Sequence, residues 1–169
     1  IRDGGGHSGI FSGRLNMIQG GASSPEGSWS VIAGGFENEL SGSGYAFGGG
    51  GHRNYVKKSN YSSIVGGLSG SITDNSKYSI IGGGASNTID GTSYYSSILG
   101  GLNNRILTGA YRSSILGGQN NLIEGTDDDI FIIGSNIIAT EANTTYVNNL
   151  NVVTGSITGA KSTLMIGYA

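Results

Sequence analysis

The 169-residue sequence has no cysteine, one proline and few charged residues. Without cysteine it has neither disulfides nor thiolate metal sites, and the scarcity of proline and lack of a Gly-X-Y period exclude collagen. Charged residues make up 12% of the chain and the formal net charge is −2, so we expect no nucleic-acid or anionic-membrane partner. No apolar run reaches the roughly 18 residues needed for a helical membrane span, and we expect none.

Glycine is abundant, with 33 residues, and much of it belongs to an internal repeat. Residues 96–106 recur almost unchanged as 113–123 and more loosely as 30–40, following the pattern S-x-I-x-G-G-x-x-N-x-I. The first glycine of the doublet position recurs at steps of 16 or 17 residues, at Gly34, Gly50, Gly66, Gly83, Gly100, Gly117 and Gly134. An earlier copy covers residues 8–18. Such a fixed short period is typical of a solenoid.

Two columns of apolar residues define the expected core of this repeat. The first holds Ile10, Ile32, Gly48, Ile64, Ile81, Ile98, Ile115 and Ile132, and the second holds Ile18, Leu40, Val56, Ile72, Ile89, Ile106, Ile123 and Ile138. β-Branched pairs bounded by glycine favour short strands, and a 16-residue unit can bury its apolar side chains only by stacking. We predict an all-β, parallel β-solenoid (β-roll) of about eight coils over residues 1–139, followed by a cap, trimerisation or linker segment over 140–169.

Glycine and asparagine columns mark the expected turns. The doublets are expected to supply positive φ angles or to let coils approach closely. The asparagines share a tolerance for left-handed backbone, and their stacked amides can form hydrogen bonds along the solenoid. This column contains Asn16, Asn38, Asn54, Asn87, Asn104 and Asn121, with Gly70 in one coil.

An aromatic column is the candidate ligand-binding strip. It begins at His7, and its candidate binding residues are Trp29, Tyr45, Tyr61, Tyr78, Tyr95 and Arg112. Flat rings stack on sugar faces, and the tyrosine tip is polar. The alternatives are that the rings cover a corner of the coil or pack against a neighbouring chain.

Catalytic and metal-binding patterns are weak, and we predict no enzyme activity, cofactor or metal. Residues 154–163 depart from the phosphate-loop spacing, and His7 and His52 lie in distant coils. The acidic residues 127–129, close to Glu124, suit either a cation or, more simply, a solvated turn. A polysaccharide-degrading tailspike needs paired carboxylates that these coils do not repeat. Ice binding usually needs a T-x-T array, which is absent.

The repeat over residues 8–138 resembles the head repeats of YadA-like trimeric autotransporter adhesins and related repeats of phage and viral tail-fibre proteins. The resemblance implies a homotrimer on a virion surface or a cell-surface appendage. It also implies an extracellular structural or adhesive segment that attaches to a host-surface glycan or protein receptor. The alternative is a passive structural spacer without binding activity.

Overall fold

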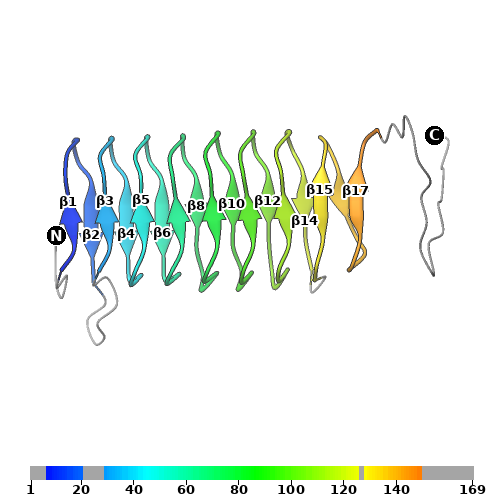
Figure 1. Cartoon of the computed structure of the whole chain (residues 1–169), viewed down its shortest axis with the longest axis horizontal. Helices are drawn as coiled ribbons and strands as arrows, with labels where there is room; N and C mark the ends of the chain where they lie inside the picture. Colours follow the sequence, from blue (N-terminus) through cyan, green and yellow to red (C-terminus); the bar gives the residue numbers. More distant parts are fainter. Residues whose placement is uncertain (1–6, 21–28, 126–127, 150–169) are drawn as a thin grey trace, which may run out of the picture.

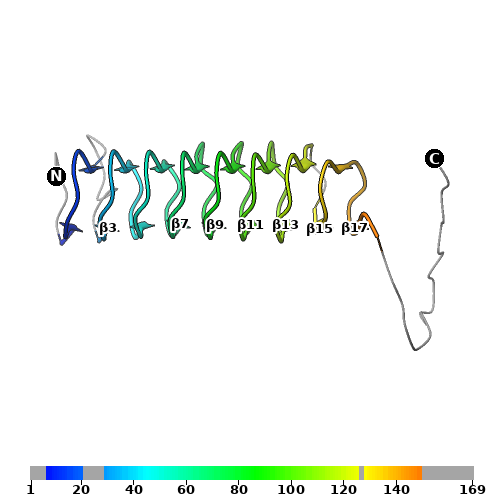
Figure 2. The ribbon, with the colours of Figure 1, turned by 90° about the horizontal axis from the view of Figure 1, so that it is seen from above.

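The chain folds into a rod of stacked coils. The computed structural model describes residues 7–20, 29–125 and 128–149. Each coil contributes one short strand to each of two parallel sheets, which form opposite sides of the rod, with β1 and β17 at its two ends (Figures 1 and 2). This confirms the predicted all-β, parallel β-solenoid. None of the described residues forms a helix able to cross a membrane.

The two sheets contain alternate strands of the chain. The nine-stranded sheet consists of β1 (Gly9–Ile10), β3 (Val31–Ile32), β5 (Phe47–Gly48), β7 (Ser63–Ile64), β9 (Ile80–Ile81), β11 (Ser97–Ile98), β13 (Ser114–Ile115), β15 (Phe131–Ile133) and β17 (Thr145–Val147). The eight-stranded sheet consists of β2 (Met17–Gln19), β4 (Glu39–Ser41), β6 (Tyr55–Lys57), β8 (Ser71–Ile72), β10 (Thr88–Ile89), β12 (Arg105–Ile106), β14 (Leu122–Ile123) and β16 (Ile138–Ala139). The strands of the nine-stranded sheet are joined by eight steps from coil to coil, and those of the eight-stranded sheet by seven. Both numbers are close to the predicted eight coils.

A thin core of stacked isoleucines runs between the sheets. Within the nine-stranded sheet, Ile98 pairs with Ile81 on one side and Ile115 on the other, so like residues lie above like. The predicted apolar columns are buried along most of their length. The second column ends at a different residue from the one predicted. Ala139, not Ile138, pairs with Ile123 and is buried, whereas Ile138 is 65% exposed.

The two glycines of a doublet have different environments. Gly101 has a φ of +94°, and a Cβ there would collide with the carbonyl oxygen of Gly118 in the next coil. A Cβ on Gly100 would meet nothing within 4 Å. Only the second glycine therefore has the positive φ and the close approach between coils that we predict for the doublet.

From Asn38 to Asn121 the asparagine column is buried, and it forms the predicted amide ladder. Asn104 Nδ2 donates to the carbonyl oxygens of Gly100 and Gly118 at 3.0 and 3.1 Å, and its Oδ1 accepts from Nδ2 of Asn121 at 3.0 Å. The expected left-handed backbone is wrong for this column. The residue before each asparagine has the positive φ instead, as Asn103 does at +54°. The column therefore consists of asparagine because of its side-chain hydrogen bonds.

The parallel ladder continues beyond residue 139. Strand β17 pairs in register with β15, placing Tyr146 beside Ile132. Residues 150–169, which include the phosphate-loop-like segment, lie outside the described residues, as does Asp127. The cap, trimerisation or linker role of 140–169 stays a prediction.

Candidate functional site

The aromatic column lies at the corner where the chain enters each strand of the nine-stranded sheet. Its residues all have left-handed backbone, with φ from +52° at Arg112 to +64° at Trp29. Such torsions are strained for bulky residues, but from Tyr61 to Arg112 a backbone hydrogen bond to the preceding coil accompanies them. The N–H of Tyr78, for example, donates to the carbonyl oxygen of Asn60 at 3.1 Å. The corner therefore holds one ring per coil in the same orientation.

The rings stack in nearly parallel planes along the rod. Centroid separations are 4.8 Å for Tyr45–Tyr61, 4.9 Å for Tyr61–Tyr78 and 5.0 Å for Tyr78–Tyr95, with planes within 9° of parallel. These separations match the spacing of neighbouring β-strands, so the ring repeat follows directly from the coil repeat. Trp29 lies parallel to Tyr45 at a wider 6.3 Å. The structure thus brings the five aromatic candidates together in one strip.

Stacking determines which part of each ring a ligand can reach. Tyr61 and Tyr78 each lie between two ring neighbours, so both of their faces are covered. They nevertheless remain 47% and 48% exposed, which leaves their edges and tips as the accessible surface. A sugar cannot lie flat on these inner rings in the way that the sequence suggests. Contacts would instead use ring edges and phenol hydroxyls.

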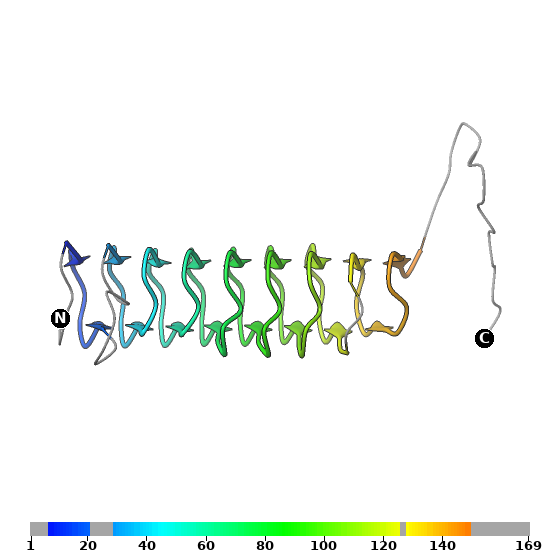
Figure 3. The ribbon, with the colours of Figure 1, turned by 90° about the horizontal axis from the view of Figure 1, so that it is seen from below.

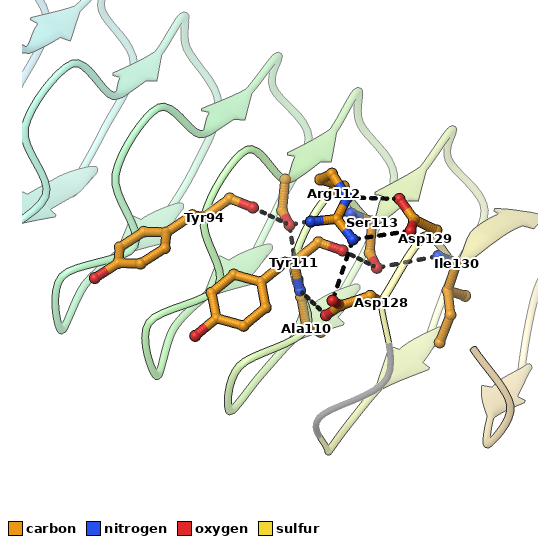
Figure 4. Close-up of polar contacts among 9 residues, drawn as sticks. Tyr94, Ala110, Tyr111, Arg112, Ser113, Asp128, Asp129 and Ile130 are labelled. Atoms are coloured by element: carbon orange, nitrogen blue, oxygen red, sulfur yellow. Dashed lines mark hydrogen bonds and ion pairs between the residues drawn. The ribbon is translucent and has the colours of Figure 1, made fainter. Parts of the chain in front are cut away.

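Arg112 ends the aromatic strip by pairing with the next coil (Figure 4). Its guanidinium donates from Nε to Oδ1 of Asp129 at 2.8 Å and from Nη2 to Oδ2 at 2.9 Å, and Nη2 also donates to Asp128 at 3.2 Å. The hydrogen bond and charge of Arg112 lower the pKa of Asp129 below its usual range. Asp128 and Asp129 are therefore paired with Arg112, while Asp127 lies outside the described residues, so the choice between a cation site and a solvated turn stays a prediction.

Sequence reasoning missed two features of this corner. Asp129 follows Arg112 by 17 residues and so occupies the next position of the same column, a signal present in the coil spacing. Tyr94 and Tyr111 form a second, shorter pair beside the strip, with centroids 5.4 Å apart and planes at 34° (Figure 4). Their spacing of 17 residues could likewise have revealed them.

The histidines take part in ring contacts. His7 stacks on Trp29 at 4.3 Å, extending the strip by one ring. His52 packs at a tilt against Phe36 at 5.0 Å, and its Nε2 lies 3.7 Å from Oε2 of Glu37. The neighbouring Arg53 lowers the pKa of Glu37 by a hydrogen bond and its charge. Within residues 7–20, 29–125 and 128–149, no group of three or more His, Asp or Glu side chains could hold a metal ion.

Comparison with known proteins adds no family assignment. No family model matches the chain, and no curated protein matches it at a significant level.

Proposed function

We propose that this chain is a structural and adhesive segment of an extracellular fibre, on a virion surface or a cell-surface appendage, that contacts a host-surface glycan or protein receptor. The observation that supports this best is the strip of parallel, half-exposed rings from Trp29 to Tyr95. Repeated identical groups suit a repetitive ligand such as a glycan chain. Each contact is weak alone, and multivalency multiplies the total affinity.

We further propose that the chain self-associates as a homotrimer. The outward positions of the nine-stranded sheet, from residue 9 to residue 147, carry no charged side chain within the described residues. Large apolar side chains are exposed there, namely Phe11, Phe47, Val65, Ile80, Leu99, Leu116 and Ile133. The eight-stranded sheet instead exposes charged groups such as Lys57 and Arg105. An apolar face beside a polar one is typical of a protein–protein contact surface.

A passive spacer is the second candidate, and one observation favours it. The ring faces cover each other, so the strip also stabilises the stacking of coils without any ligand. Each stacked pair contributes about 0.5–1.5 kcal/mol beyond the area it buries.

Glycan-array binding by paired variants separates the two functions. Replacing Tyr61 and Tyr78 by phenylalanine keeps the stack and removes only the hydroxyls, whereas replacing both by alanine removes the rings. The adhesive function predicts binding by the wild type, reduced binding by the phenylalanine variant and still weaker binding by the alanine variant. Undiminished binding after alanine substitution of all five aromatic residues would exclude the strip. Lack of binding by the wild type would favour the spacer.

A further inference from the structure

A small polar pocket lies beside the aromatic strip, in the connections that lead from β4, β6 and β8 to the next strands. It has a volume of about 260 Å³ and is lined by Gly42, Lys58, Asn60, Asn75 and Lys77. Asn60 and Lys77 directly precede two rings of the strip. The volume is slightly below the roughly 300–1,000 Å³ of typical small-molecule sites, so the pocket suits one sugar ring.

The pocket forms where the coil length changes. Six residue steps lead from Ile72 to Tyr78, but only five lead from Val56 to Tyr61. The longer connection closes on itself, since the N–H of Lys77 donates to the carbonyl oxygen of Asn75 at 2.9 Å. Small loops project from the coils drawn in green, whereas the shorter coils lack them (Figures 2 and 3). The pocket therefore lies where a short connection is followed by a longer one in the next coil.

The polar groups around the recess include two ammonium groups without an acidic partner. Neither Lys58 nor Lys77 forms an ion pair with any carboxylate in the described part of the chain, and no acid lines the pocket. The stem of Lys58 lies over Gly42, because a Cβ on that glycine would meet Lys58 Cγ at 3.7 Å. The pocket is therefore positively charged although the whole chain has a net charge of −2.

The two amides provide neutral hydrogen-bonding groups. Asn60 Oδ1 accepts from the N–H of Gly44 at 2.8 Å, while its Nδ2 makes no hydrogen bond to the described residues. Asn75 Nδ2 donates to the Tyr94 hydroxyl at 2.9 Å, which fixes the amide with its Oδ1 as an acceptor. An anion can thus accept hydrogen bonds from Lys58, Lys77 and Asn60, and a sugar hydroxyl can donate one to Asn75.

We propose that this pocket binds the anionic group of an acidic saccharide, a sugar that carries a carboxylate or a sulfate. The site rests on the proposed adhesive function and gives it a ligand class. Lysine ammonium groups form strong charge-assisted hydrogen bonds with such anions. The adjoining ring edges of Tyr61 and Tyr78 contact the rest of the glycan. The neutral strip and the charged pocket together select acidic over neutral chains.

The experiment titrates the full chain with sialyllactose, galactose 6-sulfate, lactose and sodium sulfate, using calorimetry at low salt. The test variant replaces Lys58 and Lys77 by methionine, which retains the side-chain stems and removes both charges. Lys57→Met is the matched control, because this exposed residue of β6 does not line the pocket. The Tyr61→Phe, Tyr78→Phe variant reports on the strip separately.

Binding of either acidic sugar supports the proposal if lactose binds at least tenfold more weakly and the double lysine variant loses at least tenfold in affinity. The two acidic probes distinguish carboxylate from sulfate as the recognised group. Lys57→Met should bind within about twofold of the wild type. Equal binding of lactose, binding of sodium sulfate alone, or an unchanged double lysine variant would overturn the site. If the double lysine variant is unchanged but the tyrosine variant is weakened, the pocket fails and the adhesive strip survives. If no saccharide binds the wild type, the pocket proposal fails and glycan attachment loses its support, whereas attachment to a protein receptor is not affected.

Discussion

At the scale of single residues, the coil depends on left-handed backbone at positions that are mostly not glycine. The corner of the aromatic strip and the turn before each buried asparagine have φ near +55°, for instance at Tyr95 and Asn103. From Glu37 onward in the turns and from Tyr61 onward at the corner, these residues donate their N–H to the preceding coil, as Asn103 does to Ala85 at 2.9 Å. Strand residues donate to the following coil instead, as Ser97 does to Ser113. Left-handed residues thus link each coil to its neighbour in the opposite direction.

The two glycines of a doublet should respond differently to alanine. Gly101→Ala introduces a side chain at a φ of +94° and against the next coil, and we expect it to cost roughly 2–4 kcal/mol. Gly100→Ala, which faces open space, should change stability by less than about 1 kcal/mol. Thermal unfolding of the two variants measures the difference. Equal midpoints would contradict the assigned close approach.

Removing the Arg112 guanidinium should raise the pKa of one carboxyl. Arg112→Gln takes away the hydrogen bonds and charge that lower the pKa of Asp129, so its titration should move toward the usual range. Because the folded-state pKa is lowered, the pair stabilises the fold above the ordinary pKa of aspartate, about 4, and this contribution is lost as the pH falls through the lowered value. Carboxyl NMR titration measures the shift, with Glu37 as an internal control that should not move. An unmoved Asp129 would exclude the pair in solution.

At the scale of elements, the asparagine ladder and the isoleucine stack hold successive coils together. Asn54 Nδ2 donates to Asn38 Oδ1 at 3.1 Å, but Gly70 interrupts the ladder one coil later. Gly70 supplies only its N–H to Asn54 and offers no side-chain oxygen to Asn87. The coils on either side of Gly70 are therefore connected by fewer side-chain hydrogen bonds than the others.

Ladder variants should change stability in opposite directions. Asn104→Ala leaves the half-buried carbonyl of Gly100 and the N–H of Asn121 without partners, and we expect a loss of about 2–3 kcal/mol. Gly70→Asn should raise the unfolding midpoint, because the new amide restores the missing hydrogen bonds of the ladder. A Cβ there would lie 3.0 Å from Asn54 Oδ1, a contact that a small shift relieves. Denaturant unfolding compares both with the wild type. A destabilised Gly70→Asn variant would show that the gap is required.

Periodicity accounts for how much of these elements the sequence could predict. Residues that repeat every 16 or 17 positions stack, so the buried isoleucines, the amide ladder and the line of rings were all predictable. The torsions do not follow from periodicity, since the sequence predicts a left-handed backbone at Asn104 whereas Asn103 has it. Nor could spacing alone show that stacked rings cover each other's faces. The lysine pocket depends on a change in connection length, and the sequence shows this change as a step from 16 to 17 residues. The spacing does not show that the change leaves a pocket.

At the scale of the whole molecule, the rod has two unlike sides. The nine-stranded sheet exposes apolar residues such as Leu99 at 55% and Val65 at 49%, and the eight-stranded sheet exposes charge. Burying such a face against other copies of the chain would stabilise the assembly by about 25 cal/mol for each Å² of apolar surface removed from water. The connections that line the lysine pocket lead out of the eight-stranded sheet, and they would stay outside the contact between copies.

A charge placed on the apolar face should separate the copies. Leu99→Lys puts an ammonium group into the proposed contact and should yield single chains at concentrations where the wild type is associated. Thr88→Lys adds the same charge at an outward position of β10 and should leave association intact. Light scattering after gel filtration measures both, and dissociation by Thr88→Lys alone would place the contact on the other sheet.

The most direct test of a self-associating fibre segment is the mass of the wild-type chain in solution, measured by sedimentation equilibrium over a range of concentrations. A homotrimer has three times the 17.2 kDa chain mass, and this is the mass we expect. A single chain of 17.2 kDa at every concentration would contradict it.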